Sequence, residues 1–473
     1  MIGRIAEAKY LVEMTQKEEA QLVAVYGRRR VGKTYLVRQA LGKKMLFEHT
    51  GLYHVGLAEQ LAAFRDSLLR HGAQNVPKLK NWREAFNALA ELITSRKNGK
   101  RVVFLDELPW MDTPKSGFVA AFEHFWNGWA SAQHHLLIVF CGSATSWLIN
   151  KVLRNKGGLH NRVTGTISLQ PFKLAECREY ADKTGLALSD EDICEAYMIF
   201  GGIPYYWSFL QKGKSLAQSV DSLVFSPEGQ LRHEYEELYS SLFVHEESYR
   251  RLVSALAKRK NGMSMNEIAA AIDMKKGGGL SKQLQELEQC GFIRRYTGWG
   301  KSRNNALFQL IDNFTLFHFA FIRGESNPDP HFWSMSTNSP QVNAWRGLAF
   351  ERVCLQHVEE IKRVLGISGV ITKVFSWRHI PDDIYPQGAQ IDLLIQRADH
   401  VVNICEMKWT DGMFAIDKSY STQLATKASV FRAVTKCRQA IHLTLVTTQG
   451  VMQNKYSGIL QSEVTLKQLL AAN

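Results

Sequence analysis

Three features of secreted or membrane proteins are absent from this sequence. Its seven cysteines contain no Cys-x-x-Cys pair, which argues against a disulfide framework or a cysteine zinc site and favours reduced thiols. The segment from Met1 to Glu7 lacks the apolar core of a signal peptide. No apolar run approaches the ~20 residues that a membrane-spanning helix needs. We therefore expect a cytoplasmic protein with no membrane association.

Acidic residues are scarce relative to basic ones. The 473 residues include 58 Lys and Arg but only 45 Asp and Glu, which gives a formal net charge of +13. Such an excess favours a polyanionic partner, nucleic acid before an anionic membrane surface, although a merely solubilising surface is the alternative. Hydrophobic residues make up 45%, as in globular proteins, and the length suggests about three domains.

The segment 26–34 reads Tyr-Gly-Arg-Arg-Arg-Val-Gly-Lys-Thr and lies between an apolar run, 21–25, and a helical pattern. Strand, glycine-bounded loop and helix in this order predict a phosphate-binding P-loop. Lys33 would reach the β- and γ-phosphates, and the Thr34 hydroxyl would ligate Mg²⁺. The residues expected at the nucleotide are Gly27, Arg28, Arg29, Arg30, Val31, Gly32, Lys33, Thr34 and Tyr35. For the three arginines, phosphate contact, inter-domain pairing and plain solvation stay open.

A second apolar run, 101–105, ends in two carboxylates. Asp106 would hold the Mg²⁺ shell directly or through water, and Glu107 would polarise the attacking water. The alternative is a helix N-cap followed by a first-turn acid. The P-loop upstream favours the catalytic interpretation.

Two further residues are candidates for sensing the nucleotide. Ser143 follows the apolar run 136–141, and a polar group at the end of a parallel strand is expected beside the P-loop. An N-cap role for Ser143 is equally compatible. Arg162, in a basic segment with Arg154 and Lys156, is a candidate arginine finger for its own or a neighbouring subunit's nucleotide. A solvated basic loop is the alternative.

Strands alternating with helices predict a parallel α/β sheet with an extra strand between the P-loop strand and the Asp-Glu strand. The motifs Gly-Arg-Arg-Arg-Val-Gly-Lys-Thr, Phe-Leu-Asp-Glu-Leu-Pro-Trp, Cys-Gly-Ser-Ala and Gly-Gly-Ile-Pro-Tyr-Tyr together resemble the archaeal-type ATPase family. That family belongs to the STAND ATPases, near the AAA+ enzymes. The resemblance implies ATP as the nucleotide and assigns the roles above to Lys33, Thr34, Asp106, Glu107 and Ser143. One departure is that Gly201-Gly202-Ile203-Pro204 offers no second sensor arginine.

The expected domain order is a P-loop ATPase domain (1–170), a helical lid (171–240), a winged-helix domain (241–325), a linker (326–340) and a C-terminal domain (341–473). Helical patterns around a Gly277–Gly279 turn, followed by a hairpin pattern, resemble a winged helix-turn-helix. Ser281, Lys282 and Gln283 would begin its DNA-recognition helix. Arg294, Arg295, Lys301 and Arg303 would make the wing basic. A winged helix used only for packing is the alternative.

The C-terminal domain contains two strand patterns, 390–395 and 403–408, joined by a turn. Alternation places Glu406 and Lys408 on one face, where Asp392 can join them. Asp392 and Glu406 would hold Mg²⁺, and Lys408 would orient or activate water for phosphodiester cleavage. The pattern resembles the PD-(D/E)XK restriction-endonuclease-like fold, although no Pro precedes Asp392. In that resemblance Glu351, on a helix continuing through Val358, matches the first-helix acid and a metal ligand. Gln423 or Lys427 would point back to the site from a later helix.

The predicted fold class is therefore α/β: a P-loop NTPase parallel sheet with a helical lid, a winged helix-turn-helix and a C-terminal α/β restriction-endonuclease-like domain. We expect ATP and Mg²⁺ as cofactors, ATP hydrolysis, DNA as a partner and metal-dependent DNA cleavage. The alternative is a non-cleaving regulatory or scaffold switch whose C-terminal domain binds a partner. A homo-oligomer and a protein partner stay open, as does an ordinary exposed hairpin at 390–408.

Overall fold

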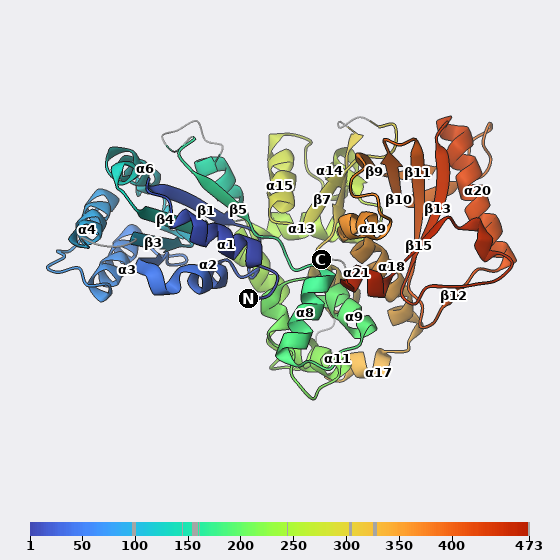
Figure 1. Cartoon of the computed structure of the whole chain (residues 1–473), viewed down its shortest axis with the longest axis horizontal. Coiled ribbons are helices and arrows are strands. Elements are labelled where there is room, and N and C mark those ends of the chain that lie inside the picture. Colours follow the sequence, from blue (N-terminus) through green and yellow to red (C-terminus); the bar gives the residue numbers. More distant parts are fainter. Residues whose placement is uncertain are drawn as a thin grey trace. The chain divides into compact units, whose positions relative to one another are not determined.

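The computed structural model describes residues 1–96, 101–143, 145–153, 159, 161–243, 245–301, 305–324 and 329–471. The chain forms two compact units, Met1–Pro171 and Phe172–Asn473 (Figure 1). Across these described ranges, no helix has the length and apolar character needed to cross a membrane.

A five-stranded parallel sheet forms the centre of the first unit. Its strands are β1 (Gln21–Tyr26), β2 (Met45–Thr50), β3 (Arg101–Asp106), β4 (Leu136–Gly142) and β5 (Gly165–Ser168). They lie in the order β2-β3-β4-β1-β5. Every residue of β4 is buried, as expected for a central strand covered on both faces. Because β4 lies between β1 and β3, the predicted extra strand is confirmed.

Helices cover this sheet. Side chains from one face of the sheet, such as Leu22 and Ala24 of β1, pack with three helices in one apolar core. These helices are α3 (Leu57–Arg70), α4 (Trp82–Ser95) and α6 (Phe118–Gly128). The predicted face of α4, with Phe86 and Leu89, is buried there. The remaining elements are α1 (Ile5–Met14), α2 (Lys33–Leu41), η1 (Gly42–Lys44), α5 (Leu108–Met111), η2 (Ala130–Ala132), α7 (Thr145–Trp147) and η3 (Leu148–Leu153). This core holds in place the carboxyl ends of β3 and β4, where Asp106 and Ser143 lie.

The second unit begins with helices, as predicted for 171–240. They are α8 (Leu174–Thr184), α9 (Asp190–Phe200), α10 (Pro204–Trp207), α11 (Leu216–Val220), η4 (Asp221–Phe225) and α12 (Glu234–Leu242). The Gly201-Gly202 pair ends α9 at a close approach of two backbones. A Cβ on Gly202 would lie 1.8 Å from the Phe172 carbonyl oxygen, so only glycine fits.

Three helices and a small antiparallel sheet follow. The helices are α13 (Glu246–Ala257), α14 (Met265–Ala271) and α15 (Gly278–Gln289), and the strands β6 (Met263–Ser264), β7 (Ile293–Tyr296) and β8 (Leu307–Leu310) lie in the order β6-β8-β7. The predicted Gly277–Gly279 turn is wrong in part, because α15 begins at Gly278 with Gly277 as its N-cap. Arg303 lies outside the described residues.

The segment 326–340 was predicted to be a linker, and its described part is not one. After α16 (Asn313–Phe317) and η6 (His318–Ile322), the helix α17 (Phe332–Ser336) carries the fully buried Trp333. The Trp333 ring packs edge-on against Phe317, and its backbone N–H donates to Asp221 Oδ1 at 2.8 Å. The free energy gained by burying these aromatic rings outweighs the preference of the nearby prolines for turns. Asn327 and Pro328 lie outside the described residues.

The last 130 residues or so form a mixed α/β layer. Two helices, α18 (Pro340–Gln356) and α19 (Val358–Val364), precede a sheet of order β15-β13-β11-β10-β9. Its strands are β9 (Thr372–His379), β10 (Ala389–Arg397), β11 (Val401–Lys408), β13 (Ala440–Thr447) and β15 (Ser462–Thr465). The predicted single helix through Val358 is wrong, because His357 leaves helical geometry and Val358 starts a new helix. The remaining elements are β12 (Phe414–Ala415), α20 (Lys418–Thr435), β14 (Val451–Met452), η7 (Ser457–Ile459) and α21 (Leu466–Ala471).

Candidate functional site

The glycine-bounded loop connects β1 to α2, as predicted. Gly27 has a φ of +148°, and a Cβ there would lie 2.2 Å from the Leu169 carbonyl oxygen. Gly32 is left-handed, with a φ of +89°, and is the N-cap of α2. Both positions therefore favour glycine, and the loop leads directly into the N-terminus of α2, the end of a helix that attracts anions.

Lys33 and Thr34 occupy the first turn of α2. Lys33 is 5% exposed, and its ammonium donates to the carbonyl oxygens of Gly27 and Arg28, each at 3.0 Å. The Thr34 hydroxyl donates to Asp106 Oδ2 at 2.8 Å. The two side chains predicted to share a Mg²⁺ ion are thus in direct contact across β1 and β3, strands that are not neighbours in sequence or sheet.

Asp106 is held at the end of β3 by two further donors. It is 4% exposed, and its Oδ1 accepts from the Glu107 N–H at 3.0 Å and from the Cys141 thiol at 2.5 Å. Burial, followed by the nearby Asp106 charge, raises the pKa of Cys141 well above its usual range, so the thiol stays protonated and donates. Sequence reasoning missed Cys141, although its position at the end of β4 offered a signal.

Glu107 and Ser143 are also in contact. The Ser143 N–H and hydroxyl donate to Glu107 Oε2 at 3.0 and 2.9 Å. Glu107 has a left-handed backbone with a φ of +47°, which is uncommon for a residue with a long side chain. The loop after β3 therefore turns the Glu107 carboxylate toward the end of β4.

The other predicted nucleotide residues differ in exposure. Arg28 and Val31 are buried, Gly32, Arg29 and Arg30 are half-buried, and Tyr35 is 59% exposed. Arg162 is exposed and has no ion-pair partner among the residues that the structure describes. Arg154 and Lys156 lie outside the described residues, as does Ala144.

The C-terminal carboxylates lie on paired strands. Asp392 lies on β10, and Glu406 and Lys408 lie on β11. The two strands are antiparallel, with Leu393 opposite Cys405, and the pairing of β10 with β9 shifts register between Ile391 and Leu394. Alternation along β11 places Glu406 and Lys408 on one face of that strand, whereas the juxtaposition of Asp392 with them stays a prediction.

Two lysines flank this face. Lys427 on α20 approaches Glu406 Oε1 to 2.6 Å, as the predicted return of a helix to the site requires. The Lys408 ammonium lies 5.3 Å from the centre of the Tyr420 ring. Gln423, the other residue predicted to point back, is exposed.

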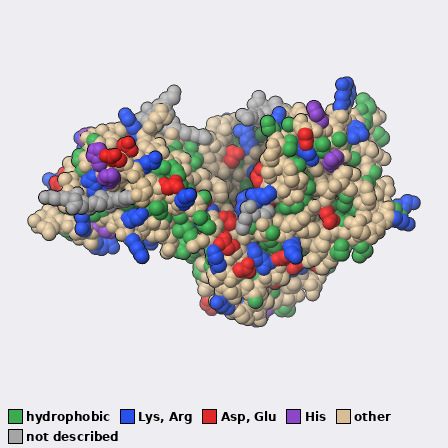
Figure 2. All heavy atoms as spheres, in the orientation of Figure 1, with side chains coloured by type: hydrophobic (Ala, Val, Ile, Leu, Met, Phe, Trp, Pro, Cys, Tyr) green, Lys and Arg blue, Asp and Glu red, His purple; other side chains and the backbone are tan. Residues whose placement is uncertain are grey.

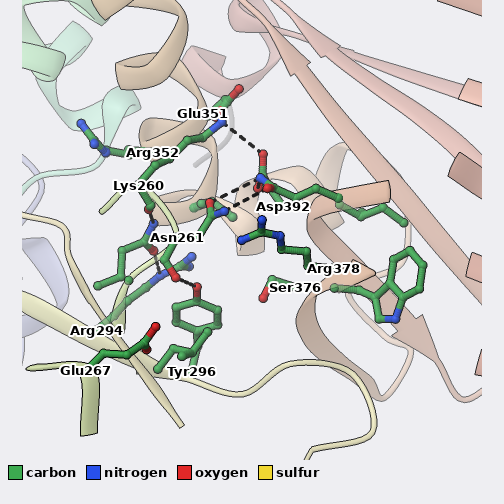
Figure 3. A pocket seen from close by; sticks show the side chains of 17 residues that line it. Lys260, Asn261, Glu267, Arg294, Tyr296, Glu351, Arg352, Ser376, Arg378 and Asp392 are labelled. Carbon is green, nitrogen blue, oxygen red and sulfur yellow. Dashed lines mark hydrogen bonds and ion pairs between the residues drawn. The ribbon is translucent and has the colours of Figure 1, made fainter. Parts of the chain in front are cut away.

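A third lysine, Lys260, lies between two of the predicted metal ligands (Figure 3). Its ammonium is 2.5 Å from Glu351 Oε2 and 3.5 Å from Asp392 Oδ2. Burial raises the pKa of the Glu351 carboxyl, although Lys260 acts in the opposite direction. Sequence reasoning missed Lys260, because it belongs to the loop between α13 and β6 and nothing local connects it to residues 351 and 392.

Whether a divalent cation can bind here depends on the contacts between these carboxylates and lysines. Within the described ranges, no group of three or more Asp, Glu, His or Cys side chains is arranged to hold a metal ion. The carboxylates of Asp392, Glu406 and Glu351 are nevertheless the hard oxygen donors that Mg²⁺ takes, and each has an ammonium beside it. The oxygen donors are therefore of the kind that Mg²⁺ takes, and lysine ammonium groups contact them in this structure.

Helix α15 borders a polar groove. A cavity of about 500 Å³ is lined by Ser281 and Gln285 of α15 with Lys276 and Arg295 around it. Gln283 instead donates to the Ser248 hydroxyl at 2.8 Å, and Arg294 turns into the pocket beside Asp392, where its Nε donates to Gln309 Oε1 at 2.6 Å. On the face drawn in Figure 2, Lys and Arg side chains are spread among acidic ones. This groove is therefore the candidate contact surface for nucleic acid.

Three comparisons relate the chain to known proteins. Residues 1–209 match the model of an ATPase domain predominantly from Archaea. The protein MJECL04 of Methanocaldococcus jannaschii is 24% identical over 427 residues, which cover 87% of this chain and 88% of that protein.

Solved structures give more distant likenesses. The Walker-type ATPase PABY2304 of Pyrococcus abyssi has a TM-score of 0.47 at 18% identity, covering 67% of this chain and 95% of that one. The ORC2 protein of Aeropyrum pernix, in ADPNP and ADP complexes, has a TM-score of 0.35 at 12% identity, covering 66% of this chain and 90% of that one.

Proposed function

Because residues 1–209 match an archaeal-type ATPase domain, we propose that this protein binds and hydrolyses ATP at the loop 27–34. The observation that carries the proposal is the contact of Thr34 with Asp106. It brings the hydroxyl and carboxylate expected around Mg²⁺ together at the mouth of the loop. The Mg²⁺ ion would neutralise charge on the phosphates.

The side chains of this site have distinct tasks in the proposed reaction. Lys33 exchanges its two carbonyl partners for phosphate oxygens when ATP enters. Ser143 holds the Glu107 carboxylate before ATP binds, and a γ-phosphate oxygen competes for the Ser143 hydroxyl. Glu107 is then free to orient and polarise the attacking water.

Two substitutions test this assignment in full-length protein. Lys33→Ala removes the phosphate contact, so ATP binding measured by calorimetry should be lost. Glu107→Gln keeps the shape of the side chain and should preserve ATP binding while turnover falls by about 10²–10⁴-fold. Unchanged turnover in Glu107→Gln would contradict the role of Glu107, whereas ATP binding that survives Lys33→Ala would contradict the loop.

A second function, DNA binding, is supported by the groove beside α15. Residues 246–311 have the element order of a winged helix: three helices, with a β-hairpin after the third. Ser281 and Gln285 are hydrogen-bonding groups suited to base edges or phosphates, and Arg295 and Lys276 add positive charge. We infer that α15 is the DNA-contacting helix of this protein.

A third function, metal-dependent phosphodiester cleavage, is supported by the pairing of β10, which carries Asp392, with β11, which carries Glu406 and Lys408. Asp392, Glu406 and Glu351 would hold Mg²⁺, and the ion would polarise the scissile phosphate. Lys408 would orient the attacking water. The competing candidate is a non-cleaving switch, supported by the lysines that already pair with the carboxylates.

A cleavage assay separates these two candidates. Purified protein is incubated with Mg²⁺ or Mn²⁺ and with single-stranded, duplex and branched DNA, with ATP, ADP or no nucleotide. Cleavage by wild type that disappears in Asp392→Ala supports the nuclease. Cleavage at the same rate in Asp392→Ala means a different site or a contaminant, and no cleavage under any condition favours the switch.

A further proposal concerns assembly and the exposed Arg162. An arginine finger must reach a neighbouring nucleotide, and Arg162 is exposed. We infer a homo-oligomer in which Arg162 of one copy contacts the nucleotide of the next. Mixing Arg162→Ala with Lys33→Ala subunits should restore part of the ATPase activity if the finger acts between subunits.

A further inference from the structure

Lys260 is the least expected member of the C-terminal carboxylate site. It lies in the loop between α13 and β6, about 90 residues before Glu351 and 130 before Asp392. Its ammonium contacts both carboxylates, at 2.5 and 3.5 Å. The three side chains are 36%, 19% and 25% exposed, so the pairs are partly shielded from solvent.

The backbone of this loop is fixed by side chains from two strands. Gln309 on β8 donates to the Lys260 carbonyl at 2.5 Å, and the Tyr296 hydroxyl on β7 donates to the Asn261 carbonyl. Asn261 in turn donates to Gln390 Oε1 at 2.9 Å, and Gln390 donates to Asp392 Oδ1 at 2.7 Å. The loop and the carboxylate strand therefore share one hydrogen-bond network, which holds Lys260 over the acids.

The Lys260 ammonium lies against two carboxylates, those of Glu351 and Asp392. A protonated amine has three donors and no acceptor, so it cannot serve as a metal ligand. It repels a second cation brought to the same oxygens.

We propose that Lys260 is a built-in counter-ion that occupies the divalent-cation position between Glu351 and Asp392, so that metal binding requires its displacement. The inference rests on the proposed metal site. Lys260, Glu351 and Asp392 line one pocket of about 230 Å³, which Arg294 and Arg378 line as well. Because Tyr296 of β7 and Gln309 of β8 hold the loop, the position of Lys260 depends on these two strands.

Metal affinity tests this competition directly, with no need for DNA cleavage. Mn²⁺ is titrated into nucleotide-free, full-length protein by calorimetry, and the binding lost in Asp392→Asn defines the signal of this site. Lys260→Met keeps the methylene packing and removes the charge, so the Asp392-dependent affinity should rise by about tenfold. Lys260→Arg keeps the charge and should bind like wild type.

Lys258→Met is the matched control. Lys258 is exposed at the end of α13, two residues from Lys260, and contacts neither carboxylate. The Lys258→Met variant loses the same formal charge as Lys260→Met. A general electrostatic effect would therefore raise the Mn²⁺ affinity of both variants, and this outcome would overturn the inference. Equal or weaker Mn²⁺ binding by Lys260→Met, still abolished by Asp392→Asn, also overturns it but leaves the metal site intact. Mn²⁺ binding that never depends on Asp392 refutes the metal site itself, and the inference with it.

Discussion

At residue 27 the absence of a Cβ atom allows the loop 27–34 to form. A Cβ would lie 2.2 Å from the Leu169 carbonyl oxygen, and the φ of +148° is one that side chains rarely adopt. Leu169 follows β5, the strand next to β1, and its N–H donates to the Tyr26 carbonyl at 2.7 Å. The close approach of these two backbones fixes the entry to the phosphate loop.

Gly27→Ala should therefore abolish ATP binding, because the loop must shift to relieve the clash and the strain of about 1–3 kcal/mol. Gly42→Ala is the control: Gly42 has a φ of −49°, and its Cβ would meet nothing within 4 Å. Calorimetry with ATP should find wild-type binding in Gly42→Ala. Normal binding in Gly27→Ala would show that the loop tolerates a different backbone.

Another residue-scale effect concerns His357, which is fully buried. Its Nε2 accepts from the Leu174 N–H at 3.0 Å, and its Nδ1 lies 2.7 Å from the Val353 carbonyl oxygen, so the neutral ring satisfies both groups. Burial, reinforced by Lys173, lowers its pKa to about 4. The unfolded chain, with an ordinary histidine pKa of about 6.5, binds this proton more readily.

Stability of the second unit should consequently fall as pH drops from about 6.5 to about 4, by ~1.4 kcal/mol per pH unit from this residue alone. Above pH 6.5 the contribution is fully present, since both states are neutral. The unfolding midpoint of His357→Gln should depend less on pH in this window than that of wild type. Parallel pH profiles for the two proteins would rule out His357 as the titrating group.

At the scale of elements, one buried ion pair joins α9 to α18. Arg346 donates to both carboxylate oxygens of Glu195 at 2.9 and 3.0 Å, and the side chains are 9% and 11% exposed. Burial raises the pKa of Glu195, although Arg346 opposes the change. This pair connects the first helices of the second unit to the helix that carries Glu351.

Removing one partner of the Glu195–Arg346 ion pair should destabilise the protein more than removing both. Arg346→Leu leaves an uncompensated buried carboxylate and should cost about 3–5 kcal/mol of unfolding free energy, whereas adding Glu195→Leu should recover most of it. Chemical denaturation of the single and double variants measures the difference. Lys9→Ala, in an exposed pair with Glu13, should change stability little. A double variant less stable than Arg346→Leu would mean that the pair is not the source of the loss.

At the scale of the whole molecule, the net charge of +13 is not by itself a binding site. Arg295 lines the groove beside α15, and Lys282 is an exposed residue of α15 that does not line it. We expect both to contact DNA phosphates. Each phosphate contact releases counterions, so DNA affinity must fall as salt rises.

The double variant Lys282→Ala/Arg295→Ala should bind DNA more weakly and reduce the slope of log K against log salt by about 1.8. Fluorescence anisotropy at several salt concentrations measures both quantities. Lys258→Ala, outside the groove, provides a charge-matched comparison for one removed lysine. An unchanged slope in the double variant would move the DNA site away from α15.

The residue patterns of the chain were sufficient for its local structure. Apolar runs predicted β1, β3 and β4, because a strand that is buried on both faces has a nearly continuous run of apolar residues. The P-loop spacing predicted which residues meet phosphate, since those requirements are local to one strand, one turn and one helix. Alternation along β11 likewise predicted that Glu406 and Lys408 share a face.

Contacts between distant residues were decided only by the tertiary structure. Cys141 beside Asp106, Ser143 on Glu107 and Lys260 between Glu351 and Asp392 join side chains that lie 35 to 132 positions apart in the chain. The packing of Trp333 into an aromatic core turned an expected linker into a helix. The sequence by itself determines the chemical group that each residue carries, such as a hydroxyl, a charge or an apolar ring. The tertiary structure determines which of these groups are in contact, because burial and pairing energies depend on neighbours that only chain folding brings together.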